Sequence, residues 1–393
     1  MSAMFKLFYF FILFGCIVGP LTAISCKNEQ DESVDWYIAY KLPREEPKPN
    51  QNGYNYATIT SKDYKESKLK LSSKLVNDSG SIWGKTLAPL YADASKYTYF
   101  AWNDDPPKEK GNGYYAHSKG VIAMDATSGF WLIHSVPNFP NLFNETYDYP
   151  TTGRENAQIS LCLSFASQLE GPKIGSILAL MRPNVYAYNL IDTIPKENDN
   201  FQSLVPSSGR KRSRNRNTVL TSSLKGSSDG TQFTVFGKSP RALIEIYSDV
   251  IGPTLKSDLY TQTWRRGAGG ILNSTCSRKT VNVMNVQSIS MKFKNDTETD
   301  DWDFTSDHSK WAITTDADNS ETSSEKNPWT CVGDINRMQS QSKRGGSVVC
   351  LKNQQLWSAF NKIIKSTEAC NQRTRKNSST RKPKAKRFFF DST

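Results

Sequence analysis

The chain has 393 residues, of which 37% are hydrophobic, 11% aromatic and 22% charged. This is the composition of an ordinary globular protein, and the length allows one large or two medium domains with a hydrophobic core. Beyond the N-terminal region no stretch is long and apolar enough to span a bilayer, which excludes an integral membrane protein. The formal net charge of +12 favours a polyanionic partner, above all nucleic acid.

The first residues have the pattern of a signal peptide. Lys6 precedes an almost wholly apolar run from Leu7 to Val18, and small residues follow at Ala23 and Ser25. This order of a charge, a short apolar segment and small residues is typical of a secretory signal, here expected over residues 1–25. The mature protein is therefore expected to be soluble and either secreted or lysosomal.

Six cysteines remain after the signal peptide, and an even number suggests three disulfides in an exported protein. They are Cys26, Cys162, Cys276, Cys331, Cys350 and Cys370. Spacing alone permits fifteen pairings, and the absence of a Cys-x-x-Cys pair argues against structural zinc. Five Asn-x-Ser/Thr sequons are candidates for glycosylation in a eukaryotic secretory route. They lie at Asn77, Asn144, Asn273, Asn295 and Asn377.

An N-terminal α/β half is expected over residues 26–195, where several segments have strand patterns. These candidates lie at 34–40, 120–124, 129–134 and 159–165. In the last of them, apolar residues at every second position share one face and leave Cys162 on the other.

The middle segment, residues 196–230, is polar, basic and poor in large apolar residues, which predicts a loop or linker. It contains the basic cluster Arg210–Arg216, and a second basic cluster runs from Arg373 to Arg387. Each cluster is either a solvated charge run, or a processing site, or an arm that holds DNA. The tail over residues 372–393 is expected to be disordered.

A C-terminal α/β half is expected over residues 231–371. A strand pattern occupies 231–236, and apolar residues at helical spacing predict helices over 240–250 and 353–367. The chain is therefore predicted to have a mixed α/β fold, in which a polar crossover joins two halves.

Histidine is scarce in this sequence, with only His117, His134 and His308. Two of the three belong to the same tripeptide, His-Ser-Lys, which occurs at 117–119 and again at 308–310. In a strand, residues i and i+2 point to one face, so each tripeptide would present an imidazole beside an ammonium group. Two such pairs brought together would form a cationic pocket of the kind that a phosphodiester needs.

Such a pocket predicts a two-step phosphodiester hydrolysis. A neutral imidazole attacks phosphorus and forms a phosphohistidine, while the second, protonated histidine gives its proton to the departing sugar oxygen and later deprotonates water. The two lysines hold the non-bridging oxygens. One neutral and one charged histidine coexist most easily in mildly acidic solution. This chemistry needs no metal and no other cofactor.

The spacing has a simpler interpretation too. Two His-x-Lys tripeptides can arise by chance in a chain of this length, and a lone histidine is usually structural. From the tripeptides alone, a catalytic pair and two unrelated structural histidines both remain open.

Longer motifs resemble the deoxyribonuclease II family, within the phospholipase-D-like superfamily, from about residue 34 to residue 371. They are Val34–Pro43, Ala116–Val121, Gly129–Pro137, Gly270–Leu272 before Cys276, Asp307–Trp311 and Pro328–Asp334. The motifs are long and stand in the family's order, which makes the resemblance specific.

The resemblance implies a phospholipase-D-like fold, in which two similar α/β halves form a pseudo-dimer with a shared central cleft. It also implies a metal-independent acid endonuclease that cuts double-stranded DNA and leaves 3′-phosphate ends. The matching catalytic residues are His117, Lys119, His308 and Lys310, with His117 expected as the nucleophile and His308 as the general acid. His134 matches a position near the site and is either a supporting residue or a core residue.

The resemblance further implies the disulfides Cys26–Cys162, Cys276–Cys370 and Cys331–Cys350. Two residues depart from the family pattern: Ser118 stands where threonine is common, and Ala312 stands where a cysteine is frequent. Neither departure removes a catalytic group. The resemblance leaves open whether the protein is a monomer or a homodimer.

Two other functions compete with the nuclease. One is a secreted, catalytically silent member of the family that binds DNA or interacts with a host, and the intact His-Ser-Lys tripeptides argue against it. The other is a phospholipase D that acts on lipid head groups, and the deoxyribonuclease-type sequences around both tripeptides argue against that.

Overall fold

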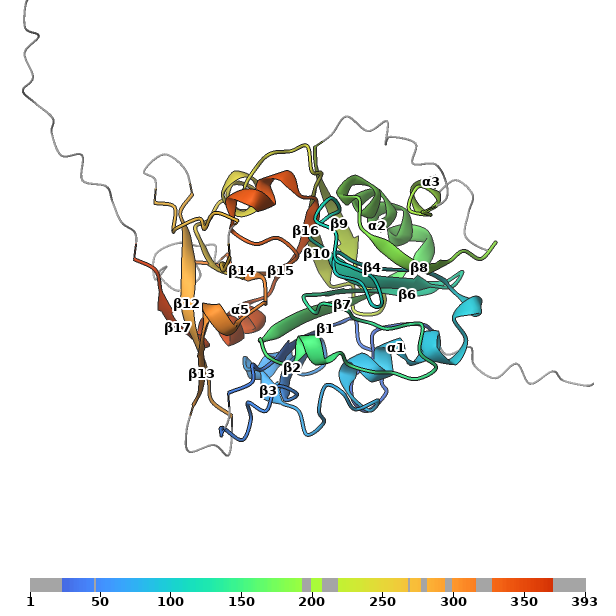
Figure 1. Ribbon diagram of the computed structural model, residues 1–393, viewed down its shortest axis with the longest axis horizontal. Helices are drawn as coiled ribbons and strands as arrows, with labels where there is room; N and C mark the ends of the chain where they lie inside the picture. Colours follow the sequence, from blue (N-terminus) through green and yellow to red (C-terminus); the bar gives the residue numbers. More distant parts are fainter. Residues whose placement is uncertain are drawn as a thin grey trace, which may run out of the picture.

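The computed structural model describes residues 23–45, 47–192, 199–206, 218–267, 269–276, 281–293, 299–315 and 327–369. Within these ranges the fold is mixed α/β and has two large sheets (Figure 1). None of the helices in the described part of the chain is long and apolar enough to cross a membrane.

The first sheet is built from residues 36–189 and has eight strands among the described residues. In spatial order they are β3 (Lys70–Leu71), β2 (Tyr56–Thr60), β1 (Trp36–Lys41), β7 (Gln158–Ala166), β6 (Ser128–His134), β5 (Lys119–Met124), β4 (Thr98–Asn103) and β8 (Val185–Asn189). All neighbouring strands pair antiparallel. The strands expected at 34–40, 120–124, 129–134 and 159–165 are therefore confirmed as β1, β5, β6 and β7.

The second sheet is built from residues 219–367 and has nine strands among the described residues. In spatial order they are β13 (Asp300–Asp303), β12 (Val283–Met291), β11 (Leu259–Gln262), β14 (Trp311–Thr314), β15 (Trp329–Gly333), β16 (Gly346–Lys352), β10 (Gln232–Lys238) and β9 (Val219–Lys225), and β17 (Ile364–Thr367) also pairs with β12. Of these pairs only β11 with β12 is parallel. The expected strand at 231–236 is confirmed as β10.

Short helices connect and cover the strands. The α-helices are α1 (Ile82–Asp93), α2 (Ser167–Met181), α3 (Asp199–Gln202), α4 (Gly252–Leu255) and α5 (Gln354–Asn361). The short turns of other helix types are η1 (Tyr64–Glu66), η2 (Ala94–Lys96), η3 (Thr151–Gly153), η4 (Tyr247–Ile251), η5 (Phe304–Ser306) and η6 (Gln339–Lys343).

The described elements pack around three hydrophobic cores, because both faces of each sheet are apolar. One face of the first sheet packs with α1, through side chains such as Trp83 and Leu87. Its other face, the second sheet, α2 and α5 form one continuous core, so these two helices lie between the sheets (Figure 1). The far face of the second sheet packs against η4 and α4, through residues such as Ile251 and Leu255.

Alternation along β7 shows how one strand serves two cores. Ile159, Leu161, Leu163 and Phe165 are buried in the core between the sheets, whereas Cys162 lies on the α1 side. This is the arrangement expected from the two-residue period of a strand.

Three expected elements differ in the structure. Strand β9 lies inside the segment 196–230, which was expected to be a linker. It is an edge strand of the second sheet and pairs with β10. The helix expected over 240–250 begins instead at Tyr247, since Leu243 has a φ of +54° that interrupts a helix. The helix expected over 353–367 ends at Asn361, and Ile364 instead pairs with Ile289 in the neighbouring strand.

Two disulfides lie within the described residues, Cys26–Cys162 and Cys331–Cys350. Cys276 is also disulfide-bonded, while its expected partner Cys370 lies outside the described residues. Three sequon asparagines, Asn77, Asn144 and Asn273, are exposed, and Asn295 and Asn377 lie outside the described residues.

The boundary of the expected signal peptide lies at the edge of the described chain. Most of residues 1–25 lie outside it, but Ile24 and Ser25 are buried, at 2% and 6% exposure. Ile24 packs in the core on the α1 side, and Ser25 shares a hydrogen bond of 2.8 Å with Ser33. Residues 24 and 25 are therefore packed within the described part of the chain. The basic clusters Arg210–Arg216 and Arg373–Arg387 lie outside the described residues.

Candidate active site

Both His-Ser-Lys tripeptides lie where the chain enters a strand. Lys119 is the first residue of β5, and Lys310 directly precedes β14. In each case the strand is followed by two more antiparallel strands and a helix: β6, β7 and α2 in one, β15, β16 and α5 in the other. The tripeptides were expected inside strands, and instead each lies at the N-terminal end of an interior strand of its sheet.

Backbone hydrogen bonds tie each tripeptide to the other sheet. The His117 N–H donates to the carbonyl of Gly345, just before β16, at 2.9 Å. The His308 N–H donates to the carbonyl of Ala157, just before β7, also at 2.9 Å. The two tripeptides are therefore held at the same junction between the sheets.

The His117 ring is oriented by a backbone carbonyl that directly follows β15 of the second sheet. Its Nδ1 lies 2.7 Å from the carbonyl oxygen of Asp334. Because a carbonyl oxygen only accepts hydrogen bonds, Nδ1 carries the proton in the neutral ring and Nε2 keeps its lone pair. The preceding N–H, of Gly333, donates to the carbonyl of Lys310 at 3.0 Å. Two consecutive residues thus connect His117 with the second tripeptide.

The second tripeptide is held by buried hydrogen bonds to its flanking carboxylate. Asp307 accepts from the Tyr40 hydroxyl at 2.6 Å, the Trp302 indole at 2.9 Å and the Ser309 N–H at 2.8 Å. The His308 ring meets the edge of Trp264 with ring centres 3.8 Å apart. These contacts fix where the imidazole of His308 stands.

The positive charges of both tripeptides act on both histidines. Burial, then the charges of Lys119, Lys310 and Arg344, lower the pKa of His117 to about 3, against the opposing charge of Asp104. Burial, then Lys310, Lys119 and His117, lower the pKa of His308 to about 2. Since each histidine responds to the lysine of the other tripeptide, the structure brings the two predicted pairs together.

The two lysines differ in their partners. Lys119 forms an ion pair with Asp104, whereas the Lys310 ammonium donates to the carbonyl of His308 at 2.5 Å. Both are nearly buried, at 8% and 4% exposure. Burial, then the charge of Lys119, lower the pKa of Lys310 to about 7, although three nearby carboxylates oppose the shift.

His134 lies close to this pocket and is 2% exposed. Its Nδ1 accepts the N–H of Val136 at 3.2 Å, so the ring proton stands on Nε2. Burial, then the charges of Lys119 and Lys310, hold the pKa of His134 well below its ordinary value. His134 is therefore both a core residue and a neighbour of both lysines.

Several buried polar atoms around the pocket lack hydrogen-bond partners within the described protein. They include His134 Nε2, His308 Nε2 and Asp334 Oδ1. Burial raises the pKa of Asp334 to about 6, although its other oxygen accepts from the N–H and hydroxyl of Ser347. Buried polar groups are normally paired, so this concentration of unpaired atoms marks a place suited to a polar ligand.

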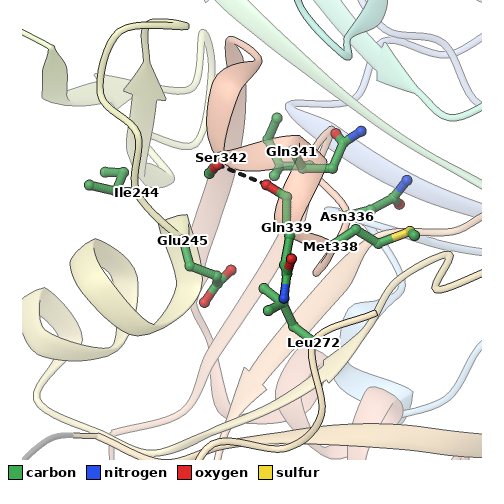
Figure 2. A pocket seen from close by; sticks show the side chains of 9 residues that line it. Ile244, Glu245, Leu272, Asn336, Met338, Gln339, Gln341 and Ser342 are labelled. Atoms are coloured by element: carbon green, nitrogen blue, oxygen red, sulfur yellow. Dashed lines mark hydrogen bonds between the residues drawn. The ribbon is translucent and has the colours of Figure 1, made fainter. Parts of the chain in front are cut away.

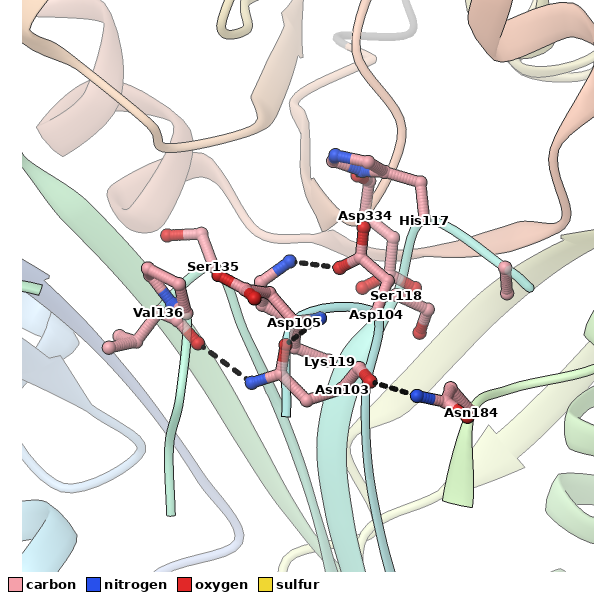
Figure 3. Close-up of polar contacts among 12 residues, drawn as sticks. Asn103, Asp104, Asp105, His117, Ser118, Lys119, Ser135, Val136, Asn184 and Asp334 are labelled. Carbon is pink, nitrogen blue, oxygen red and sulfur yellow. Dashed lines mark hydrogen bonds and ion pairs between the residues drawn. The ribbon is translucent and has the colours of Figure 1, made fainter. Parts of the chain in front are cut away.

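Sequence reasoning missed the charged residues that support the pocket. Figure 3 shows Asp104 facing Lys119, and Arg344 binds the same carboxylate at 3.0 Å. Asn103, the last residue of β4, donates hydrogen bonds to the carbonyls of Val136 and Phe139, and Figure 3 shows the bond to Val136. Nothing in the sequence distinguishes Asp104 from Asp105 beside it, because only the tertiary fold brings Asp104 to Lys119.

A separate cavity of about 230 Å³ is lined in part by Asn336 (Figure 2). Its lining includes Leu272, Met338 and Gln339, and none of the predicted catalytic residues takes part. This cavity is therefore distinct from the junction where the two tripeptides meet.

The fold and its comparisons define the class of the protein. The mixed α/β architecture with two sheets is that of the phospholipase-D-like hydrolases to which deoxyribonuclease II belongs. A family model described as Deoxyribonuclease II matches residues 25–370, and the chain belongs to this family of enzymes.

Three named relatives are similar to this chain over most of its length. The chain is 34% identical to Plancitoxin-1 of Acanthaster planci, over 93% of this chain and 98% of that protein. It is 35% identical to Deoxyribonuclease-2-beta of Homo sapiens, over 91% and 94%. It is 30% identical to Deoxyribonuclease-2-alpha of Sus scrofa, over 91% and 93%.

Proposed function

We propose that this deoxyribonuclease is a metal-independent acid endonuclease, which hydrolyses double-stranded DNA to 3′-phosphate ends through a phosphohistidine intermediate. The observation that carries the proposal is the convergence of both His-Ser-Lys tripeptides at one junction, where the Gly333–Asp334 dipeptide bonds to both. The ammonium groups of Lys119 and Lys310 supply the positive charge that a phosphodiester in its transition state requires.

His117 is the proposed nucleophile. Its Nδ1–H is engaged by the carbonyl of Asp334, which leaves the Nε2 lone pair for attack on phosphorus. The bond from Nε2 to phosphorus forms as the bond to the 5′ oxygen of the next nucleotide breaks. Water then attacks the phosphohistidine, releases the 3′-phosphate and restores the imidazole.

His308 is the proposed general acid. It protonates the departing 5′ oxygen and then takes a proton from the attacking water. Its pKa is low in the free protein because of burial and the neighbouring lysines. A bound phosphodiester places a negative charge beside the ring and raises that pKa. Protonation of His308 is still favoured at low pH, so activity is expected to be highest in mildly acidic solution.

His134 is proposed as a supporting residue, because its Nε2–H is buried beside both lysines without a protein acceptor. The two sheets, each with its own tripeptide, are proposed as two similar halves of one pseudo-dimeric fold. A route through the secretory pathway is proposed from residues 1–25, and the disulfides agree with an oxidising compartment.

The test is nicking of supercoiled plasmid by the purified mature protein at about pH 5 in EDTA, where histidine gains protons. The proposal expects cutting by the wild type and none by His117→Ala. The products should be substrates for a 3′-phosphatase. DNA binding without cutting at any pH would contradict the proposal and would favour a silent DNA-binding member of the family.

A further inference from the structure

Asp104 lies at the centre of a nearly buried cluster of charges. It directly follows β4, and one carboxylate oxygen pairs with the ammonium of Lys119. The other oxygen pairs with the Arg344 guanidinium at 3.0 Å. The three side chains are only 9–15% exposed, so their charges act on one another with little screening by water.

Arg344 reaches this carboxylate from the second sheet's side of the junction, after η6. Its Nε donates to the carbonyl of Tyr115 at 3.0 Å, and its Nη2 donates to the carbonyl of Ala116 at 3.1 Å. These are the two residues that precede His117. Arg344 therefore binds both Asp104 and the backbone that leads into the first tripeptide.

The cluster makes the two active-site lysines chemically different. Lys119 has a carboxylate partner, whereas Lys310 donates to a neutral carbonyl. The surrounding cations hold the pKa of Asp104 far below its ordinary value, although burial opposes this. Asp104 is therefore anionic in neutral and in mildly acidic solution.

A carboxylate and a phosphate compete for the same ammonium group, because both bind it through charged oxygens. We propose that Asp104 is a positioning residue that acts as an internal counter-ion: it holds Lys119 and Arg344 when no phosphate is bound and competes with the substrate phosphate for them. The proposal rests on the proposed function, since it takes a phosphodiester as the ligand of Lys119. Asp104 orients Lys119 for catalysis and, at the same time, limits how tightly DNA and the phosphate-bearing product bind.

The proposal predicts that two substitutions change phosphate affinity in opposite directions. Asp104→Asn keeps the shape and removes the charge, so inorganic phosphate should bind about tenfold more tightly, the usual effect of one adjacent charge. The same variant should lower kcat, because Lys119 loses its orientation and product leaves more slowly. Arg344→Gln removes a cation and leaves Asp104 to Lys119 alone, so phosphate should bind about tenfold more weakly.

A purely structural role predicts a different result. It would make Asp104→Asn bind phosphate more weakly and would lower kcat together with affinity. Asp105→Asn is the matched control, since Asp105 is the next residue and, within the described chain, forms no ion pair with Lys119 or Arg344. It should leave phosphate affinity and kcat unchanged.

The experiment measures inorganic phosphate binding by titration calorimetry, and plasmid nicking, for the full mature wild type and these three variants at about pH 5. Thermal unfolding establishes that each variant is folded. Tighter phosphate binding with lower kcat in Asp104→Asn supports the proposal, and unchanged or weaker binding overturns it. If Asp104→Asn does not fold, Arg344→Gln decides, because unchanged phosphate affinity there overturns the proposal.

The outcomes for the two proposals are separable. A wild type that neither cuts DNA nor binds phosphate contradicts the proposed function. A wild type that does both, with Asp104→Asn binding phosphate no more tightly, contradicts only the role of Asp104.

Discussion

The hydroxyl of Tyr40, near the end of β1, donates a hydrogen bond of 2.6 Å to the carboxylate of Asp307, the residue before the second His-Ser-Lys tripeptide. The same hydroxyl lies 2.7 Å from the Ser309 hydroxyl and accepts the Trp311 indole N–H at 3.1 Å. One phenol thus joins the strand that carries it to both flanks of His308. The second tripeptide is positioned as much by the first sheet as by its own.

Tyr40→Phe should therefore lower both stability and activity. The substitution leaves the buried Asp307 with one donor fewer, which costs about 1–3 kcal/mol in the free energy of unfolding. Urea denaturation measures this cost, and plasmid nicking should fall with it. The control is Tyr37→Phe in the same strand, because the buried Tyr37 hydroxyl lacks a hydrogen-bond partner in the described protein. Equal effects of both substitutions would refute the anchoring role of Tyr40.

The two histidines should be distinguishable with an activated substrate. His117→Ala should lose at least about a thousandfold in rate with every substrate, because it removes the nucleophile. His308→Ala should recover the first step with a nitrophenyl phosphodiester, whose leaving group needs no proton, and should accumulate on His117 the phosphoryl group with its remaining ester. Quenched-flow and mass spectrometry measure the release and the adduct. A phosphorylated His308 in the His117→Ala protein would reverse the assignment.

Acid should destabilise the protein when no DNA is bound. The folded-state pKa of His134 is held well below its ordinary value of about 6.5. Below pH 6.5 the His134 imidazole therefore binds a proton in the unfolded chain but not in the folded chain, so the free energy of unfolding falls as pH falls. For one such histidine the slope approaches about 1.4 kcal/mol per pH unit. Urea denaturation from pH 7 to pH 4 measures it, and His134→Gln should flatten the curve. A curve of unchanged slope would show that His134 is not held neutral.

The two described disulfides should contribute unequally to stability. Cys26–Cys162 closes 136 residues of chain, whereas Cys331–Cys350 closes 19 between directly paired strands. In the loop-entropy model the longer loop adds about 2 kcal/mol more to the free energy of unfolding. Replacing each pair by alanines and measuring urea denaturation compares them. A larger loss from the Cys331–Cys350 pair would show that loop entropy does not dominate here.

Much of the fold could be predicted from local sequence patterns. The strands β1, β5, β6 and β7 were evident because their apolar residues alternate or run continuously, which is how strands buried on one or both faces appear. Strand β9 was not, since an edge strand with polar residues such as Thr221 and Ser222 has the composition of a loop. Ile364 was assigned to a helix by its spacing, but the open side of β12 binds that segment as a strand.

The chemistry of the site was evident for a different reason. His-Ser-Lys occurs twice in a chain with only three histidines, so the proposed reactive groups can be identified from the sequence. The charged residues that position them cannot. Asp104 and Arg344 lie 240 residues apart, and only the docking of one sheet's connections against the other brings them together. Sequence patterns record local periodicity, whereas this ion pair depends on tertiary contacts.

One backbone hydrogen bond joins His117 to Gly345, and another joins His308 to Ala157. These bonds have a consequence for when the active site can form during folding. Neither sheet can complete its own tripeptide, so a chain with one half folded has no assembled pocket. On this arrangement, DNA cleavage is expected only after the two sheets have docked. We therefore expect the nuclease to be inactive until both sheets have folded and docked, without a separate inhibitor.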